Sequence, residues 1–204
     1  MQQAQPSQTK SKWIEVSKLI SNFFNPLTSL TLYTVYYSFH HYDLADAVED
    51  LLLTLLFLIL PIAGWIYWNV KRGAYSNMDV SNRRQRNTLY IFIVVVMLLY
   101  IGAKYYLNGV VDYSILFLFT LLVLMQISNF MIKSSMHTAL NVFAAALFLS
   151  QDVLLGLIWG VIAVVVGITR VILKRHTVQE VLMGAFLAIF VSLAYLYTYI
   201  QSQV

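Results

Sequence analysis

The chain contains no cysteine among its 204 residues, and only 11% of its residues are charged. The absence of cysteine excludes disulfides and thiolate metal sites, and it leaves the redox compartment undefined. Hydrophobic residues make up 60% of the sequence, whereas a soluble domain has about half apolar and about a quarter charged residues. This composition argues against a soluble globular protein and against a disordered one.

Long stretches without Asp, Glu, Lys or Arg indicate membrane-crossing helices, each of which needs about 20 mainly apolar residues. Seven such windows stand out: 19–42, 51–70, 87–103, 113–132, 134–151, 153–169 and 181–204. We therefore expect an all-α, polytopic transmembrane helical bundle. The first window contains Asn22, Asn25 and Pro26, a pattern that also fits an interfacial helix, a break and then a span. Seven spans is the prediction and six is the alternative.

The connections between these windows are short, which favours antiparallel neighbours in one bundle. We expect residues 1–18 to form a polar N-terminal tail, disordered over its first 12 residues, and residues 19–204 to form a single transmembrane domain. The N-terminus does not resemble a signal peptide, because its first apolar segment is broken by Asn and Pro.

The charges divide unevenly between the two ends of the predicted bundle. Alternating the connections by side places 12 of the 13 Lys and Arg residues with the N-terminus, and only Lys104 on the other side. The other side also carries six of the nine acidic residues, namely Asp43, Asp46, Glu49, Asp50, Asp112 and Asp152. Because Lys and Arg are retained in the cytoplasm, the cationic side is expected to face it. The expected location is a bacterial inner membrane.

Three polar segments on the cationic side carry residues suited to chemistry: 79–86, 133–138 and 169–180. His176 and Glu180 are four residues apart and would share a helix face. A carboxylate bonded to one imidazole nitrogen fixes the tautomer and leaves the other nitrogen as a nucleophile. His137, at the start of another helix, could act as a general acid.

Cations in the same segments could bind a phosphoryl group. Arg83, Arg86, Lys133 and Arg170 offer charge-assisted hydrogen bonds, and helix N-termini near Ser135 and Thr177 would add backbone N–H groups. Two histidines, one carboxylate and several cations suit phosphoryl transfer through a phosphohistidine, and suit a divalent metal poorly. We expect no metal and no cofactor.

At these residues the chain resembles the type 2 phosphatidic acid phosphatase family, whose members are related to bacterial acid phosphatases and vanadium haloperoxidases. Segment 169–180 reads T-R-x5-H-x3-E, close to the family's S-R-x5-H-x3-D, and segment 134–137 reads S-S-M-H where the family has P-S-G-H. The family's K-x6-R-P is reduced to Arg83 and Arg86, and Asn87 follows in place of Pro. Segments 79–86 and 134–137 are separated here by two apolar windows, whereas the corresponding two motifs of the family share one loop.

The resemblance implies a role for each matching residue. His176 would attack phosphorus, Glu180 would orient His176, and His137 would protonate the leaving oxygen. Arg170, Arg83, Arg86 and Ser135 would hold the phosphate oxygens; our own inference adds Lys133 in place of the missing motif lysine. Membrane members of the family expose this site on the extracytoplasmic side, whereas the charge bias here predicts a cytoplasmic one.

The sequence thus predicts an integral membrane lipid phosphatase that hydrolyses a lipid phosphomonoester or diphosphate without a metal. The expected partners are the bilayer and a lipid phosphate, with no nucleic acid, while the oligomeric state stays open. One alternative is a catalytically impaired relative that binds lipid phosphate, because Met136 replaces the family's glycine. A second is a membrane transporter, and a vanadium haloperoxidase is a weaker third. The sequence does not choose among phosphatidic acid, phosphatidylglycerol phosphate, a prenyl diphosphate and a phosphorylated glycolipid.

Overall fold

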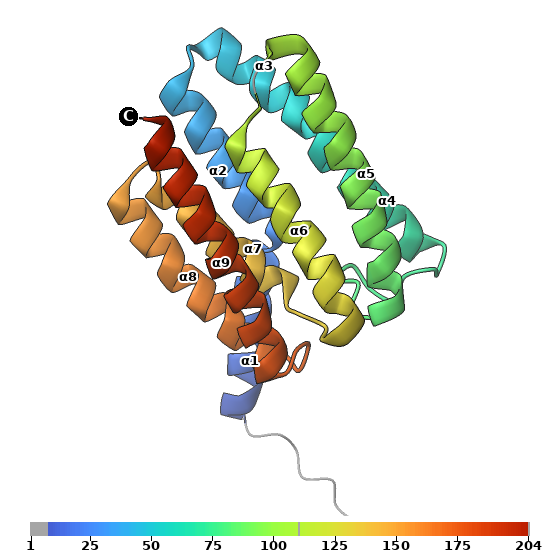
Figure 1. Cartoon of the computed structure of the whole chain (residues 1–204). Coiled ribbons are helices and arrows are strands. Elements are labelled where there is room, and N and C mark those ends of the chain that lie inside the picture. The colour runs from blue at the N-terminus through green and yellow to red at the C-terminus, as the bar shows by residue number, and fades with distance from the viewer. Residues whose placement is uncertain (1–7, 110, 204) are drawn as a thin grey trace, which may run out of the picture.

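The computed structural model describes residues 8–109 and 111–203, and these form an all-helical bundle (Figure 1). Its elements are α1 (Gln8–Phe23), α2 (Pro26–His41), α3 (Leu44–Thr54), the π-helical turn η1 (Leu55–Ile59), α4 (Leu60–Lys71), α5 (Arg83–Asn108), α6 (Tyr113–Met131), α7 (Met136–Leu149), α8 (Val153–Ile172) and α9 (Val178–Ser202). The predicted all-α fold is confirmed for this part of the chain.

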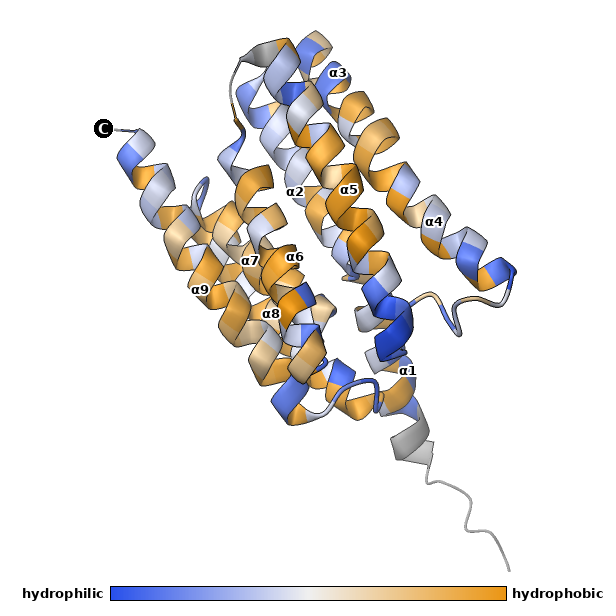
Figure 2. Ribbon diagram, turned by 45° about the vertical axis from the view of Figure 1, so that its right-hand side comes forward, coloured by the Kyte–Doolittle hydropathy of each residue, from blue (hydrophilic) through white to orange (hydrophobic). Residues whose placement is uncertain are grey.

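Five of the described helical segments are long and apolar enough to cross a membrane: Leu44–Lys71, Arg83–Leu107, Tyr113–Met131, Val153–Ile172 and Val178–Ser202. Apolar residues cover their length and hydrophilic residues gather towards the ends of the bundle (Figure 2). The length and composition of these helices indicate an integral membrane protein. The fifth predicted window corresponds to α7, which is apolar but has only 14 residues.

The first predicted window is not one continuous helix. The chain breaks at Phe24 and Asn25, where the Asn25 side chain accepts hydrogen bonds from the N–H groups of Leu27 and Thr28. Pro26 occupies the first turn of α2, where its missing N–H is not needed. The Asn and Pro residues therefore end one helix and begin the next, as the alternative reading of this window anticipated.

The expected boundary between tail and domain at residue 18 falls within α1. From Gln8 onward the described chain is helical; the part of the expected disorder that falls on residues 1–7 lies outside the described residues. Ser17 and Ser21 are buried where α1 packs on α8, while Leu19 and Phe23 are exposed. Helix α1 thus places small polar side chains inward and apolar ones outward, as an interfacial helix does.

Helix α7 lies at the centre of the bundle and packs against α8, α9 and α2. Ten of its 14 residues are buried, with Phe143 and Ala144 fully so. A Cβ atom on Gly156 of α8 would lie 2.5 Å from the Cα of Leu149. Only glycine therefore permits this close approach between the end of α7 and the start of α8.

Helices α3, η1, α4 and α5 form a second group beside the helices around α7 (Figures 1 and 2). Helices α3, η1 and α4 run as one segment, and Pro61 follows the π-helical turn. Proline lacks an N–H and crowds the preceding turn, which the wider π-helical turn accommodates. At the end of the bundle remote from Arg86, an ion pair between Asp50 and Lys104 ties α3 to α5, and Ser38 of α2 donates to Asp50.

Candidate phosphate-binding site

The three polar segments predicted to meet do come together at one end of the bundle. Arg86, on the first turn of α5, donates a 2.8 Å hydrogen bond to the carbonyl oxygen of Ser134. Lys133 lies 3.3 Å from the carbonyl oxygen of Arg175. The site is thus assembled from the starts of α5 and α7 and from the α8–α9 connection.

His176 and Glu180 form the hydrogen bond that their spacing predicted. Nδ1 of His176 lies 2.8 Å from Oε2 of Glu180, although His176 precedes α9 and is not part of it. The contact arises from a capping box, in which Thr177 accepts from the Glu180 N–H and Glu180 accepts from the Thr177 N–H. With Nδ1 bonded to a carboxylate, the proton resides there and Nε2 is left as the acceptor nitrogen.

His137 is the second residue of α7, and its ring is almost completely buried. Its Nε2 atom lies 3.7 Å from Oδ1 of Asp79. Ser135 is the N-cap residue of this helix, and its side chain accepts from the Thr138 N–H at 3.4 Å. The start of α7 therefore holds His137 at the edge of the site, as expected from the sequence.

Two buried arginines supply hydrogen-bond donors that have no partner among the described residues. Arg86 is 4% exposed and leaves Nη1 unpaired, and Arg170 is 2% exposed and leaves Nε unpaired. The buried hydroxyl of Ser134 is also unpaired. Buried donors are normally satisfied, so this cluster has the chemistry of a site for an oxyanion.

Asp79 is the site residue that the sequence did not single out. Its Oδ2 atom accepts hydrogen bonds of 3.1 Å from both Nη1 and Nη2 of Arg170 and lies 3.7 Å from Nε of Arg175. Asp79 belongs to the α4–α5 connection, so this contact joins the two groups of helices across the site. The only sequence signal was a lone acid in a cationic loop.

The backbone beside Asp79 is strained. Val80 is almost completely buried and has a φ of 46°, a left-handed conformation that a β-branched residue rarely adopts. Such strain costs about 1–3 kcal/mol and persists only where the surroundings impose it. The loop is therefore forced into the shape that carries the Asp79 carboxylate to Arg170.

Ser135 connects the start of α7 to the first turn of α9. Its N–H donates to the carbonyl oxygen of Glu180 at 2.9 Å, and its hydroxyl accepts from Thr138. A Cβ atom on Gly184 of α9 would lie 2.6 Å from the Ser135 carbonyl oxygen. Gly184, which sequence reasoning missed, thus lets α9 and the start of α7 pack closely enough to join His176 and His137 in one site.

Lys133 and Arg83 stand at different distances from this cluster. Nζ of Lys133 lies 4.0 Å from Oε2 of Glu180, in a half-buried position beside the site. Arg83 is exposed, and its Nε donates to the carbonyl oxygen of Asn129 at the end of α6. A cation at a helix C-terminus stabilises the last carbonyl groups, so Arg83 joins α5 to α6 outside the cluster around Arg86.

The surroundings shift the pKa values of the groups outside the spans. Burial, and then the positive charge of Arg86, lowers the pKa of His176 to about 2. Burial alone would raise the pKa of Asp79, but the charges of Arg170, His137 and Arg175 together outweigh burial and lower that pKa. Burial lowers the pKa of Lys133, and Glu180 opposes the shift. At neutral pH the site therefore presents a neutral His176 imidazole and an ionised Asp79.

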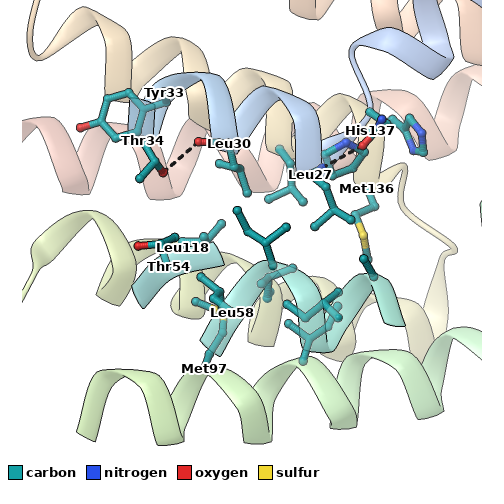
Figure 3. Close-up of a pocket in the computed structure, with 18 of the residues that line it drawn as sticks. Leu27, Leu30, Tyr33, Thr34, Thr54, Leu58, Met97, Leu118, Met136 and His137 are labelled. Atoms are coloured by element: carbon teal, nitrogen blue, oxygen red, sulfur yellow. Dashed lines mark hydrogen bonds between the residues drawn. The ribbon is translucent and has the colours of Figure 1, made fainter. Parts of the chain in front are cut away.

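A cavity of about 400 Å³ opens from this cluster into the bundle. His137, Arg86, Arg170, His176 and Asp79 line one end of it. Mostly apolar side chains line the rest, with Met136 and His137 at one end of the view in Figure 3 and Leu58, Met97 and Leu118 further in. Arg83, Lys133 and Ser135 are not among the residues that line the cavity.

No group of three or more His, Asp or Glu side chains in the described part of the chain lies close enough to hold a metal ion. Comparison with protein-family models, curated proteins and solved structures finds no match for this chain.

Proposed function

We propose that this protein is an integral membrane lipid phosphatase that hydrolyses a lipid phosphomonoester or diphosphate through a phosphohistidine and needs no metal. One observation carries the proposal. A neutral histidine with an available Nε2 lies beside two buried arginines with unpaired donors, at the mouth of an apolar cavity. The donors suit a phosphate group, and the cavity suits a hydrocarbon tail.

In the proposed reaction, Nε2 of His176 attacks phosphorus while the bond from phosphorus to the lipid oxygen breaks. His137 gives a proton to the departing oxygen, and Glu180 stabilises the positive charge that develops on the His176 ring. Arg86 and Arg170 stabilise the charge on the phosphoryl oxygens. Water then attacks the phosphohistidine with His137 as the base, which releases phosphate and restores His176.

The placement in the membrane follows from the same features. Counting α2 and α7 with the five long helices gives seven spans, and α1 lies at the interface. The cationic end of the bundle would face the cytoplasm of a bacterial cell. A lipid would then enter the cavity from the inner leaflet of the inner membrane.

A second candidate, a catalytically impaired protein that binds lipid phosphate, is favoured by two observations. The Met136 side chain lines the cavity where the resembled family has glycine, and the Asp79 carboxylate already occupies two donors of Arg170. Both reduce the space and charge left for a phosphate. A binding protein would retain a lipid phosphate without turnover.

Phosphate release by the purified protein separates the two candidates. The assay uses a panel of lipid phosphates with a chelator present, and compares the wild type with His176→Ala. Release by the wild type and at least a thousandfold slower release by the variant supports the phosphatase. Binding without release by the folded wild type favours the second candidate.

A further inference from the structure

The cavity extends from the cationic end of the bundle to the opposite end. Arg86 and Lys104 both line it and both lie on α5. They are 18 residues apart, so at a rise of about 1.5 Å per residue the cavity spans roughly 27 Å along this helix. The hydrocarbon core of a bilayer is about 30 Å thick, so the cavity runs through nearly all of it.

The middle of the cavity is apolar and is enclosed by several helices. Leu30 of α2, Leu58 of η1, Met97 of α5 and Leu118 of α6 surround it (Figure 3). The middle offers no charge to a ligand, so it favours hydrocarbon. Because side chains from both groups of helices contribute, the space lies between the groups and inside the protein.

At the far end of the cavity several polar groups are paired with one another, whereas the buried Tyr33 hydroxyl, which also lines the cavity, has no hydrogen-bond partner among the described residues. Asp50 and Lys104 form an ion pair, and the hydroxyl groups of Thr54 and Tyr100 lie 2.8 Å apart. Charged groups that satisfy each other offer no vacant partner to a second head group. The end of an apolar chain can therefore terminate against them without leaving a buried charge unpaired.

We propose that this cavity binds one hydrocarbon chain long enough to cross both leaflets, as in the phosphate of a long polyprenol, with its phosphate at Arg86 and Arg170. The head-group end of this inference rests on the proposed function. A chain from an ordinary phospholipid covers one leaflet, about 15 Å, and would leave the inner half of the cavity empty. An empty apolar cavity forfeits the contacts of its lining, so a longer chain is bound preferentially.

The test locates the end of the bound hydrocarbon chain directly. The probe is a long-chain polyprenyl monophosphate with a photoreactive diazirine on its last isoprene unit, carried in phosphatidylcholine vesicles with the full-length His176→Ala protein. We expect crosslinks at Thr54 and Tyr100. A probe with half the chain length should instead label residues near Leu58. Labelling confined to lipid-facing residues such as Leu99, which is 70% exposed, would overturn the inference.

A pair of variants on α6 tests the same inference by blocking the cavity. Leu118 lines the cavity, whereas Leu116, two residues away, does not line it and is exposed. Leu118→Trp should reduce crosslinking at Tyr100 at least tenfold, while Leu116→Trp should leave it within twofold. Equal labelling of Tyr100 in both variants would contradict the proposal that the bound hydrocarbon chain passes Leu118.

The two proposals fail in different ways. If the wild type releases no phosphate from any lipid but the long probe still labels Tyr100, the proposed phosphatase activity is refuted and the proposed binding of a long hydrocarbon chain stands. If the wild type releases phosphate equally well from lipid phosphates with short and long hydrocarbon chains, and no probe labels the far end of the cavity, the proposed binding of a long hydrocarbon chain is refuted and the proposed phosphatase activity stands.

Discussion

Replacement of Gly184 by alanine should damage the site from a helix that carries no reacting group at that position. The new Cβ would lie 2.6 Å from the carbonyl oxygen of Ser135 and 3.1 Å from its nitrogen. Ordinary contacts of this kind lie at about 3.5 Å, so α9 and the start of α7 must separate by roughly 1 Å. Both neighbours are backbone atoms, which cannot rotate out of the way.

This separation would lower the proposed phosphatase activity, because it lies between the two histidines. It lengthens the hydrogen bond from Ser135 to the Glu180 carbonyl oxygen and moves His137 relative to His176. A misplacement of about 1 Å can lower a rate about a hundredfold, and overpacking costs about 1–3 kcal/mol of stability. We expect both effects, measured as kcat/KM for lipid phosphate and as thermal unfolding in detergent.

Gly160→Ala is the matched control, because a Cβ at Gly160 of α8 meets no atom within 4 Å. It should leave activity unchanged and, by helix propensity, raise stability by up to about 1 kcal/mol. If Gly184→Ala has the activity of the wild type, the close approach of α9 to Ser135 does not position the site.

Three further results are expected. Asp79→Asn should tighten inhibition by inorganic phosphate about tenfold, since it removes a carboxylate that competes for Arg170; weaker inhibition would contradict this role. Because the pKa of His176 is lowered to about 2, this proposed nucleophile stays neutral in mild acid, and kcat/KM should not fall with an apparent pKa near 6.5 as the pH decreases to 5. Asn141→Leu should destabilise the protein by about 3 kcal/mol in chemical unfolding, because buried Asn141 bonds Ser29 of α2 and the backbone at the break after α1; a loss below about 0.5 kcal/mol would refute it.

Much of the fold could be predicted because hydrophobic length alone identifies membrane helices. The five long helices match windows without charges, and the pairing of His176 with Glu180 followed from their spacing. The break at Asn25 and the short α7 were harder to define. Their lengths depend on packing, through the bonds of Asn141 and the close contact at Gly156, and packing is not a property of a local window.

The parts of the site that sequence reasoning missed depend on contacts between distant segments. Asp79 reaches Arg170 across 91 positions of the chain, and Gly184 matters only because Ser135 lies against it. Arg83 and Arg86 look equivalent in the sequence, three residues apart. On the first turns of α5, however, Arg83 faces the end of α6 whereas Arg86 faces the cavity, so only one of them lies among the site residues.

The most direct test of the central claim is a search for a phosphoryl group on His176. The purified protein is mixed with a radiolabelled lipid phosphate in the presence of a chelator, and quenched within one turnover. We predict an acid-labile, base-stable label on a peptide that contains His176, absent from His176→Ala and retained in Leu116→Trp. Turnover of the substrate with no label on His176, or an equal label in His176→Ala, would contradict the account.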